Sequence, residues 1–274
     1  MSGMELSVLY LVLVAFAGGV IGAAIGALQA FSLAGLVIVI GEVYSIVHRM
    51  AGEPVPIDIT GSIGFGAVLG PHVAFGGGAA AVAYAAHRGY LDDEFQYHPG
   101  KHVTKALTGR ADVLLVGGVF GIAGFLMAET ATRVSIPTDP VALGVVLSAL
   151  LHRGILGYDF IGKPEVGGWL DMSPYERRER HSQSNRLLVE PWLPYQYRWG
   201  VVTLLGISVG VLAAYLAYLT ASAFLAFGIS VVVLAFLCAG VANIPVTHHI
   251  ALPASTIRRR NQDPPCNCRS RWIG

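Results

Sequence analysis

Charged residues are scarce in this sequence. Of its 274 residues, 13% are Asp, Glu, Lys or Arg, whereas 54% are hydrophobic. A soluble domain carries about 25% charged residues, so this chain lacks the polar surface needed to cover a globule in water. The composition excludes a soluble protein and predicts an all-α, polytopic membrane protein whose main partner is the lipid bilayer.

Cysteines and catalytic motifs are also scarce. The three cysteines, Cys238, Cys266 and Cys268, do not have the spacing of a disulfide framework or a zinc site. The sequence has no P-loop, no HExxH, no G-x-S-x-G and no series of histidine boxes. We therefore expect no enzyme, no catalytic residue, no cofactor, no bound metal and no nucleic-acid partner.

Seven hydrophobic stretches come close to the length of a membrane span. A crossing helix needs about 20 apolar residues. Six stretches are expected to be full spans: 6–28, 31–47, 112–128, 140–155, 199–219 and 222–244. The seventh, 62–87, is interrupted and predicts a broken or re-entrant helix, while 245–257 is too short to cross. Residues 1–257 would thus form one transmembrane domain, with the polar loop 156–198 inserted and a basic, disordered tail at 258–274.

Basic residues predict the orientation of the chain. Residues 88–110, residues 153–198 and the tail from Arg258 hold 16 of the 18 Lys and Arg residues. Cytoplasmic segments of membrane proteins are enriched in these residues, so the three segments are expected in the cytoplasm of a plasma-membrane protein. The N-terminus would lie outside if 62–87 crosses the membrane and inside if it re-enters. In the loop, Ser173 and Glu176 have capping-box spacing, which predicts a helix through 177–186.

Small residues recur at four-residue spacing in three of the predicted helices: Gly18, Gly22 and Gly26; Gly117 and Gly121; Gly206 and Gly210. This spacing allows close helix packing in lipid, within the chain or in a homo-oligomer or hetero-complex. Each of these helices is followed by a second apolar helix and then by a histidine at an apolar break, in GPHVAFGGG, ALLHRGILG and VTHHIALPA. The pattern suggests internal repeats, as in many transporters; chance similarity is the alternative.

The stretch GFGAVLGPHVAFGGGAAA, residues 64–81, brings helix breakers into an apolar segment. One half-helix is expected to end near Leu69 and another to start near Gly76. Unpaired backbone at membrane depth lines a cavity or is buried in protein, and His72 in the break would carry a proton or contact a substrate. A kinked helix with a hydrogen-bonded histidine is the alternative. The backbone groups predicted to face a ligand are those of Gly70, Pro71, Gly76, Gly77 and Gly78.

Glu42 is the clearest polar anomaly within a predicted span. A carboxylate in hydrocarbon is costly unless it is paired or protonated, so such residues often mark ion pathways; a link to a neighbouring helix end is the alternative. Asn243, His248 and His249 lie at the break that matches the one at His72. His152 is expected to be structural, because a cation at a helix end complements the helix dipole.

These features favour a transporter or channel with a pathway lined by discontinuous helices. It would move an ion or small solute, with proton or sodium coupling, and Glu42, Asn243, His72, His248 and His249 would bind or relay the ion. Replacing Glu42 with Gln is then expected to abolish coupled flux. The alternative is a non-catalytic subunit of a larger membrane complex.

Overall fold

The computed structural model describes residues 3–91, 95–162, 166–182, 184–191 and 193–260. Within these residues the regular secondary structure is helical, and no strand forms beyond an isolated bridge between Arg180 and Leu187. The α-helices are α1 (Gly3–Ile25), α2 (Ala27–Ala51), α3 (Gly76–His87), α4 (Ala111–Arg133), α5 (Pro140–Ile155), α6 (Ser173–Glu176), α7 (Trp199–Thr220), α8 (Leu225–Val232), α9 (Leu234–Cys238) and α10 (His248–Arg260). Two π-helical turns, η1 (Thr60–Gly64) and η2 (Pro71–Phe75), precede α3, and a 3-10 turn, η3 (Pro99–Lys101), follows it.

Four of the described helices are long and apolar enough to cross a membrane: Ser7–Ile25 within α1, and the whole of α2, α4 and α7. The prediction of a helical membrane protein is thereby supported, but the expected count of about seven spans is not confirmed. Pro140–Ile155 and Leu225–Cys238 are apolar but shorter. The predicted span 222–244 ends early because the chain turns at Gly240, which has a φ of 86°.

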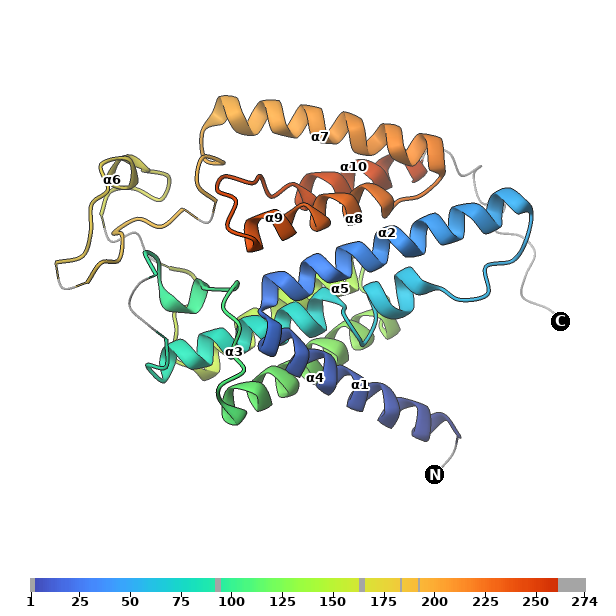
Figure 1. Cartoon of the computed structure of the whole chain (residues 1–274), viewed down its shortest axis with the longest axis horizontal. Helices are drawn as coiled ribbons and strands as arrows, with labels where there is room; N and C mark the ends of the chain where they lie inside the picture. The colour runs from blue at the N-terminus through green and yellow to red at the C-terminus, as the bar shows by residue number, and fades with distance from the viewer. Residues whose placement is uncertain (1–2, 92–94, 163–165, 183, 192, 261–274) are drawn as a thin grey trace.

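The interrupted segment runs the length of the bundle as a broken helix. Residues later in this segment contact residues earlier in α2. The pairs are Thr60 with Gly41, Gly64 with Ile38, and Gly78 with Ala27. It therefore passes antiparallel to α2 and does not turn back, and Figure 1 shows α3 reaching the end of the bundle where α2 starts. The helical turns end at Gly64 and resume at Pro71, where η2 leads directly into α3. The half-helices expected to end near Leu69 and to start near Gly76 therefore end and start about five residues earlier.

Glycines bring α1, α4 and the broken helix into direct backbone contact. A side chain at Gly19 would collide with the backbone of Gly117 in α4, and one at Gly22 would collide with Ala74 in η2. The small-residue spacing of α1 and α4 is thus used within the chain. In α7, by contrast, a methyl group at Gly206 or Gly210 would meet no described atom within 4 Å.

The loops after α3 and α5 lie at one end of the bundle, while the N-terminus and the end of α2 lie at the other (Figure 1). The start of α10 is level with the first turns of α2, since the ring centroids of His248 and Phe31 are 5.0 Å apart. From there α10 runs toward the end at which α2 ends.

The structure tests one prediction about the polar segments, the helix in the 156–198 loop, whereas the cytoplasmic placement of the tail stays a prediction. The end of α10, Arg258–Arg260, lies opposite the loops 88–110 and 153–198, because residues 245–257 continue as a helix along the bundle. The rest of the tail, 261–274, is outside the described residues. In the loop, the helix stops at Glu176 instead of continuing through 186, because Arg178 turns the chain with a φ of 56°.

Candidate functional site: a polar file along the broken helix

Glu42 is buried on α2, with 8% of its surface exposed. Its carboxylate accepts a 2.5 Å hydrogen bond from the hydroxyl of Ser222, and the same hydroxyl oxygen accepts a bond from the backbone N–H of Leu225. Ser222 follows Ala221, which has a φ of 51° and makes the turn between α7 and α8. The predicted intramembrane carboxylate thus has a partner, and the pair fixes the α7–α8 turn against α2.

His72 lies on the other side of the broken helix, against α4 and α5. Its carbonyl oxygen touches Gly124 so closely that any side chain at that position would collide with it. A methyl group at Gly144 would lie 3.1 Å from the Cβ of His72. The side chain is 3% exposed, and no group in the described residues forms a hydrogen bond with its Nδ1. Two glycines therefore create the space that admits this histidine into the core.

One face of α5 continues from His72 toward the loop end of the bundle. The buried residues of α5 are Gly144, Ser148 and His152, at four-residue spacing. This spacing places side chains one above the other on a single helix face. Ser148 is fully buried, and its hydroxyl has no partner among the described residues. A methyl group at Gly76 would lie 3.6 Å from that hydroxyl oxygen, so Ser148 faces the start of α3.

His152 lies one turn beyond Ser148. It is 8% exposed, and its ring packs edge-on against Phe120 at 5.8 Å. Its Nδ1 faces the backbone of Ser148 without forming a hydrogen bond of good geometry. We call His72, Ser148 and His152 the polar file. The eight residue-to-residue steps from Gly144, which contacts His72, to His152 rise about 12 Å along α5, which sets the length of the file.

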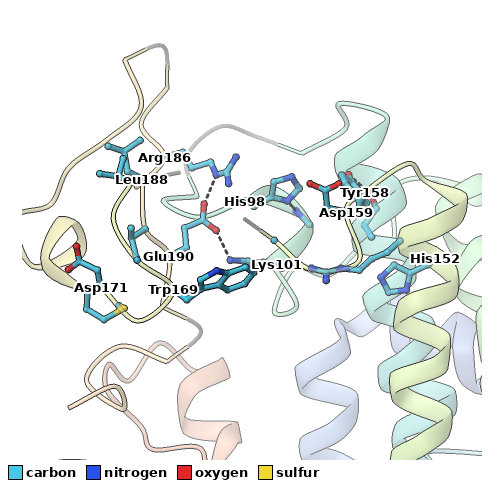
Figure 2. Close-up of a pocket in the computed structure, with 18 residues that line it drawn as sticks. His98, Lys101, His152, Tyr158, Asp159, Trp169, Asp171, Arg186, Leu188 and Glu190 are labelled. Carbon is cyan, nitrogen blue, oxygen red and sulfur yellow. Dashed lines mark hydrogen bonds and ion pairs between the residues drawn. The ribbon is translucent and has the colours of Figure 1, made fainter. Parts of the chain in front are cut away.

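The polar file ends at a cavity of about 630 Å³ between the two basic loops. His152 lines it from the bundle side, and Figure 2 shows His98, Lys101 and Glu190 around it. Glu190 accepts a 2.7 Å bond from Lys101 Nζ and a second bond from Arg186 Nε. Burial opposes ionisation of Glu190, but the bonds from Lys101 and Arg186 hold its pKa below the ordinary value. This cluster joins the loop after α5 to the loop after α3.

Aromatic and imidazole rings form another part of the cavity wall. Tyr158 donates a 3.2 Å bond to the carbonyl oxygen of Ala83 and packs edge-on against His98, with ring centroids 5.4 Å apart. Burial, followed by the charge of Arg186, lowers the pKa of His98. Its Nδ1 accepts a 3.1 Å bond from the backbone N–H of Gly100, so the neutral ring carries its proton on Nε2.

A smaller cavity, of about 130 Å³, lies between α1 and α4. It is lined by Phe125, Glu129, Thr130 and Arg133, among others. Gly124, which contacts His72, immediately precedes this segment of α4. Ionisable side chains therefore line cavities in both directions along the bundle from His72.

The other predicted site residues do not join His72. His248 packs against Phe31 and Phe227, and its ring centroid is 4.0 Å from that of His249. His249 is exposed, as is Asn243, which lies in the loop before α10 with a φ of 64°. Glu42, His72 and the His248–His249 pair thus occupy three separate places.

The glycines at the start of α3 pack closely against neighbouring segments. The N–H of Gly76 donates to the carbonyl oxygen of Pro71, because η2 leads directly into α3. Gly77 approaches the backbones of Gly19 and Gly117, while Gly78 approaches Ala27. Of the predicted backbone positions, Gly70 and Pro71 remain at the break itself.

Sequence reasoning missed Ser148 and assigned His152 a structural role only. The four-residue spacing of Gly144, Ser148 and His152 is the signal that would have identified a polar face on this apolar helix. Thr60 was missed too: its hydroxyl is buried beside Gly41 and has no partner among the described residues. In the part of the chain that the structure describes, no three His, Cys, Asp or Glu side chains form a group that could hold a metal.

Comparison with known proteins identifies a family. A family described as "Family of unknown function (DUF7973)" matches residues 1–264. No curated protein and no solved structure matches the chain.

Proposed function

The chain belongs to the DUF7973 family of unknown function, and we propose that it is a membrane transporter or channel that moves protons along the polar file. The observation that carries the proposal is the alignment of His72, Ser148 and His152 between the broken helix and α5, ending at a polar cavity. His72 and Ser148 have polar atoms that are buried and lack a described partner.

The energetic cost of this arrangement supports a functional role. A buried polar atom without a hydrogen bond costs about 1–3 kcal/mol. Polar side chains within membrane segments are rare and concentrate along substrate and ion pathways. Apolar residues at positions 72, 148 and 152 would avoid the cost, so three such side chains along the contact between the broken helix and α5 point to use of the polar groups.

The residue types suit proton movement. A neutral imidazole accepts a proton at one ring nitrogen and releases one from the other. A serine hydroxyl both donates and accepts, so Ser148 would connect the two histidines with the help of bridging water. The cavity at His152 would supply protons from the loop end, and the Glu129 cavity would receive them at the other.

Glu42 has a different place in this proposal. Because it is bonded to Ser222 on the far side of the broken helix, it would anchor the α7–α8 turn and not relay protons. Flux retained in the Glu42→Gln variant would fit this assignment, whereas its loss would return Glu42 to the pathway.

The test is a flux assay on the purified protein in liposomes. A pH-sensitive dye inside the vesicles reports proton movement under an imposed pH gradient, with potassium and valinomycin setting the voltage. We expect acidification well above that of protein-free vesicles. A second arm imposes a sodium gradient at equal pH. Sodium movement without proton movement would reject the proton pathway in favour of a cation pathway.

A second candidate function, a subunit of a larger complex, is favoured by α7. Only 11% of its apolar segment is buried inside the chain, against 28–44% in the other three long apolar helices. Its Gly206 and Gly210 lack close neighbours among the described residues. Purification in mild detergent separates the two functions, because an obligate subunit would co-purify with unlike chains.

A further inference from the structure

We propose that the cavity between the loops binds a small oxyanion, the carboxylate or phosphate group of a soluble solute. The site is made by Lys101, Arg153 and Arg186 together with His98, from both basic loops and the end of α5 (Figure 2). Its volume of about 630 Å³ falls in the usual range for small-molecule sites. The proposal is independent of the proton pathway, because binding can be measured without transport.

Positive charge exceeds negative charge around His98. Arg186, Lys101 and Arg153 all act electrostatically on its ring, and Glu190 opposes them. Glu190 is the one carboxylate that pairs with these cations in the described residues, and it is shared between Lys101 and Arg186. Three cations therefore act on the ring of His98 against one carboxylate, so positive charge is concentrated at this part of the wall, while the cavity as a whole is also lined by Asp159 and Asp171.

Two more carboxylates, Asp159 and Asp171, line the cavity, and neither is among the charges that act most strongly on His98. Asp171 accepts bonds from the backbone N–H and the hydroxyl of Ser173. Asp159 is exposed and lies next to Tyr158 (Figure 2). Neither forms a described ion pair with Lys101, Arg153 or Arg186.

The N–H donors of Arg153 and His98 in the cavity wall are suited to binding an oxyanion. Arg153 donates from Nη1 to the carbonyl oxygen of Phe160 at 2.7 Å, which orients its guanidinium and leaves further N–H donors on the fork. Guanidinium groups bind carboxylate and phosphate through paired N–H bonds. The Nε2–H of neutral His98 is another donor in the same wall. Lys101 and Arg186 would each exchange part of their contact with Glu190 for the ligand.

The experiment titrates the full-length protein in detergent with inorganic phosphate and, separately, with citrate, at low ionic strength. Trp169 lies in the cavity wall and is 69% exposed, so tryptophan fluorescence reports occupancy. The variant Trp169→Phe assigns the signal to this residue, and calorimetry measures affinity independently of it. We expect saturable binding of one or both anions. Phosphate binding alone indicates a phosphate-bearing solute, and citrate binding alone indicates a carboxylate.

Two variants with opposite effects protect the test against simple loss of folding. Arg153→Gln should weaken binding about tenfold, because it removes a positively charged guanidinium group with paired N–H donors. Glu190→Gln should tighten binding, because it releases Lys101 and Arg186 from their shared carboxylate. Arg177→Gln is the matched control, since Arg177 pairs with Glu179 on the same loop and does not line the cavity. Absence of saturable binding, or wild-type binding in a folded Arg153→Gln protein, would overturn the proposal.

Discussion

The hydroxyl of Ser222 donates a 2.5 Å hydrogen bond to the carboxylate of Glu42 across 180 residues of sequence. This bond joins α2 to the turn that follows α7, and a second link, from Arg49 to the carbonyl oxygen of Thr220, lies at the same end. Both bonds lie on the side of the broken helix away from His72. The relationship makes Glu42 a structural anchor that can be tested separately from the polar file.

Replacing Ser222 with Ala should lower the free energy of unfolding by about 1.5–3 kcal/mol, the range for a hydrogen bond to a charged group. Glu42→Gln should cost less, because the amide oxygen still accepts from Ser222. Thermal unfolding in detergent measures both, and a cycle with Glu42→Ala and the double variant gives the coupling energy. Additive effects in the cycle would show that the pair contributes nothing.

Ser148→Ala should leave the protein as stable as the wild type or more stable, because it removes a buried hydroxyl that no described residue satisfies. Ser255→Ala is the matched control. Ser255 is also fully buried, but its hydroxyl donates a 2.7 Å bond to the carbonyl oxygen of Ala251. Relative to the wild type, the unfolding temperature should therefore be unchanged or higher in Ser148→Ala and lower in Ser255→Ala. A large loss of stability in Ser148→Ala would assign that hydroxyl to packing.

Gly124→Ala should destabilise the protein, because the added methyl group collides with the carbonyl oxygen of His72. The backbone on both sides must move, and overpacking of this kind costs about 1–3 kcal/mol. Gly206→Ala on α7 is the control: its methyl group has open space, and Ala is the better helix former by about 1 kcal/mol. Equal unfolding temperatures for the two variants would contradict the packing described here.

The Glu190 cluster predicts a pH dependence of loop stability. The pKa of Glu190 is lowered in the folded protein, so its contribution is present above the pKa of the unfolded state and is lost as pH falls through the folded value. Proteolysis of the 156–198 loop should accelerate over this acidic range. In Glu190→Gln cleavage should be faster at neutral pH and less dependent on pH. Identical pH profiles in the two proteins would reject the role of the cluster.

Local chemistry predicted the membrane class and the break. Hydropathy depends on composition within each stretch, so α1, α2, α4 and α7 could be located from sequence. Gly70 and Pro71 break a helix through their own backbone properties, and helical turns resume at Pro71 accordingly. The expected number of spans is not confirmed, because turns such as that at Gly240 interrupt apolar sequence.

Contacts between residues on different helices could not be predicted from the sequence. The bond from Ser222 to Glu42 depends on how α2 packs against the α7–α8 turn, and sequence spacing does not specify that packing. The same holds for His72, whose surroundings are created by Gly124 and Gly144 on two other helices. Seen along the sequence, Glu42 and His72 looked like one site, and the three-dimensional packing separates them.

The most direct test of the account compares proton flux in liposomes for His72→Gln and His152→Gln with flux for His48→Gln. His48 is the matched control because its Nδ1 lies 3.0 Å from the carbonyl oxygen of Tyr44 on α2, away from the polar file. Each of the first two variants should lower proton flux about tenfold or more, as expected when a positioned proton carrier is removed. His48→Gln should retain wild-type flux. Wild-type proton flux in a folded His72→Gln protein would contradict the central claim.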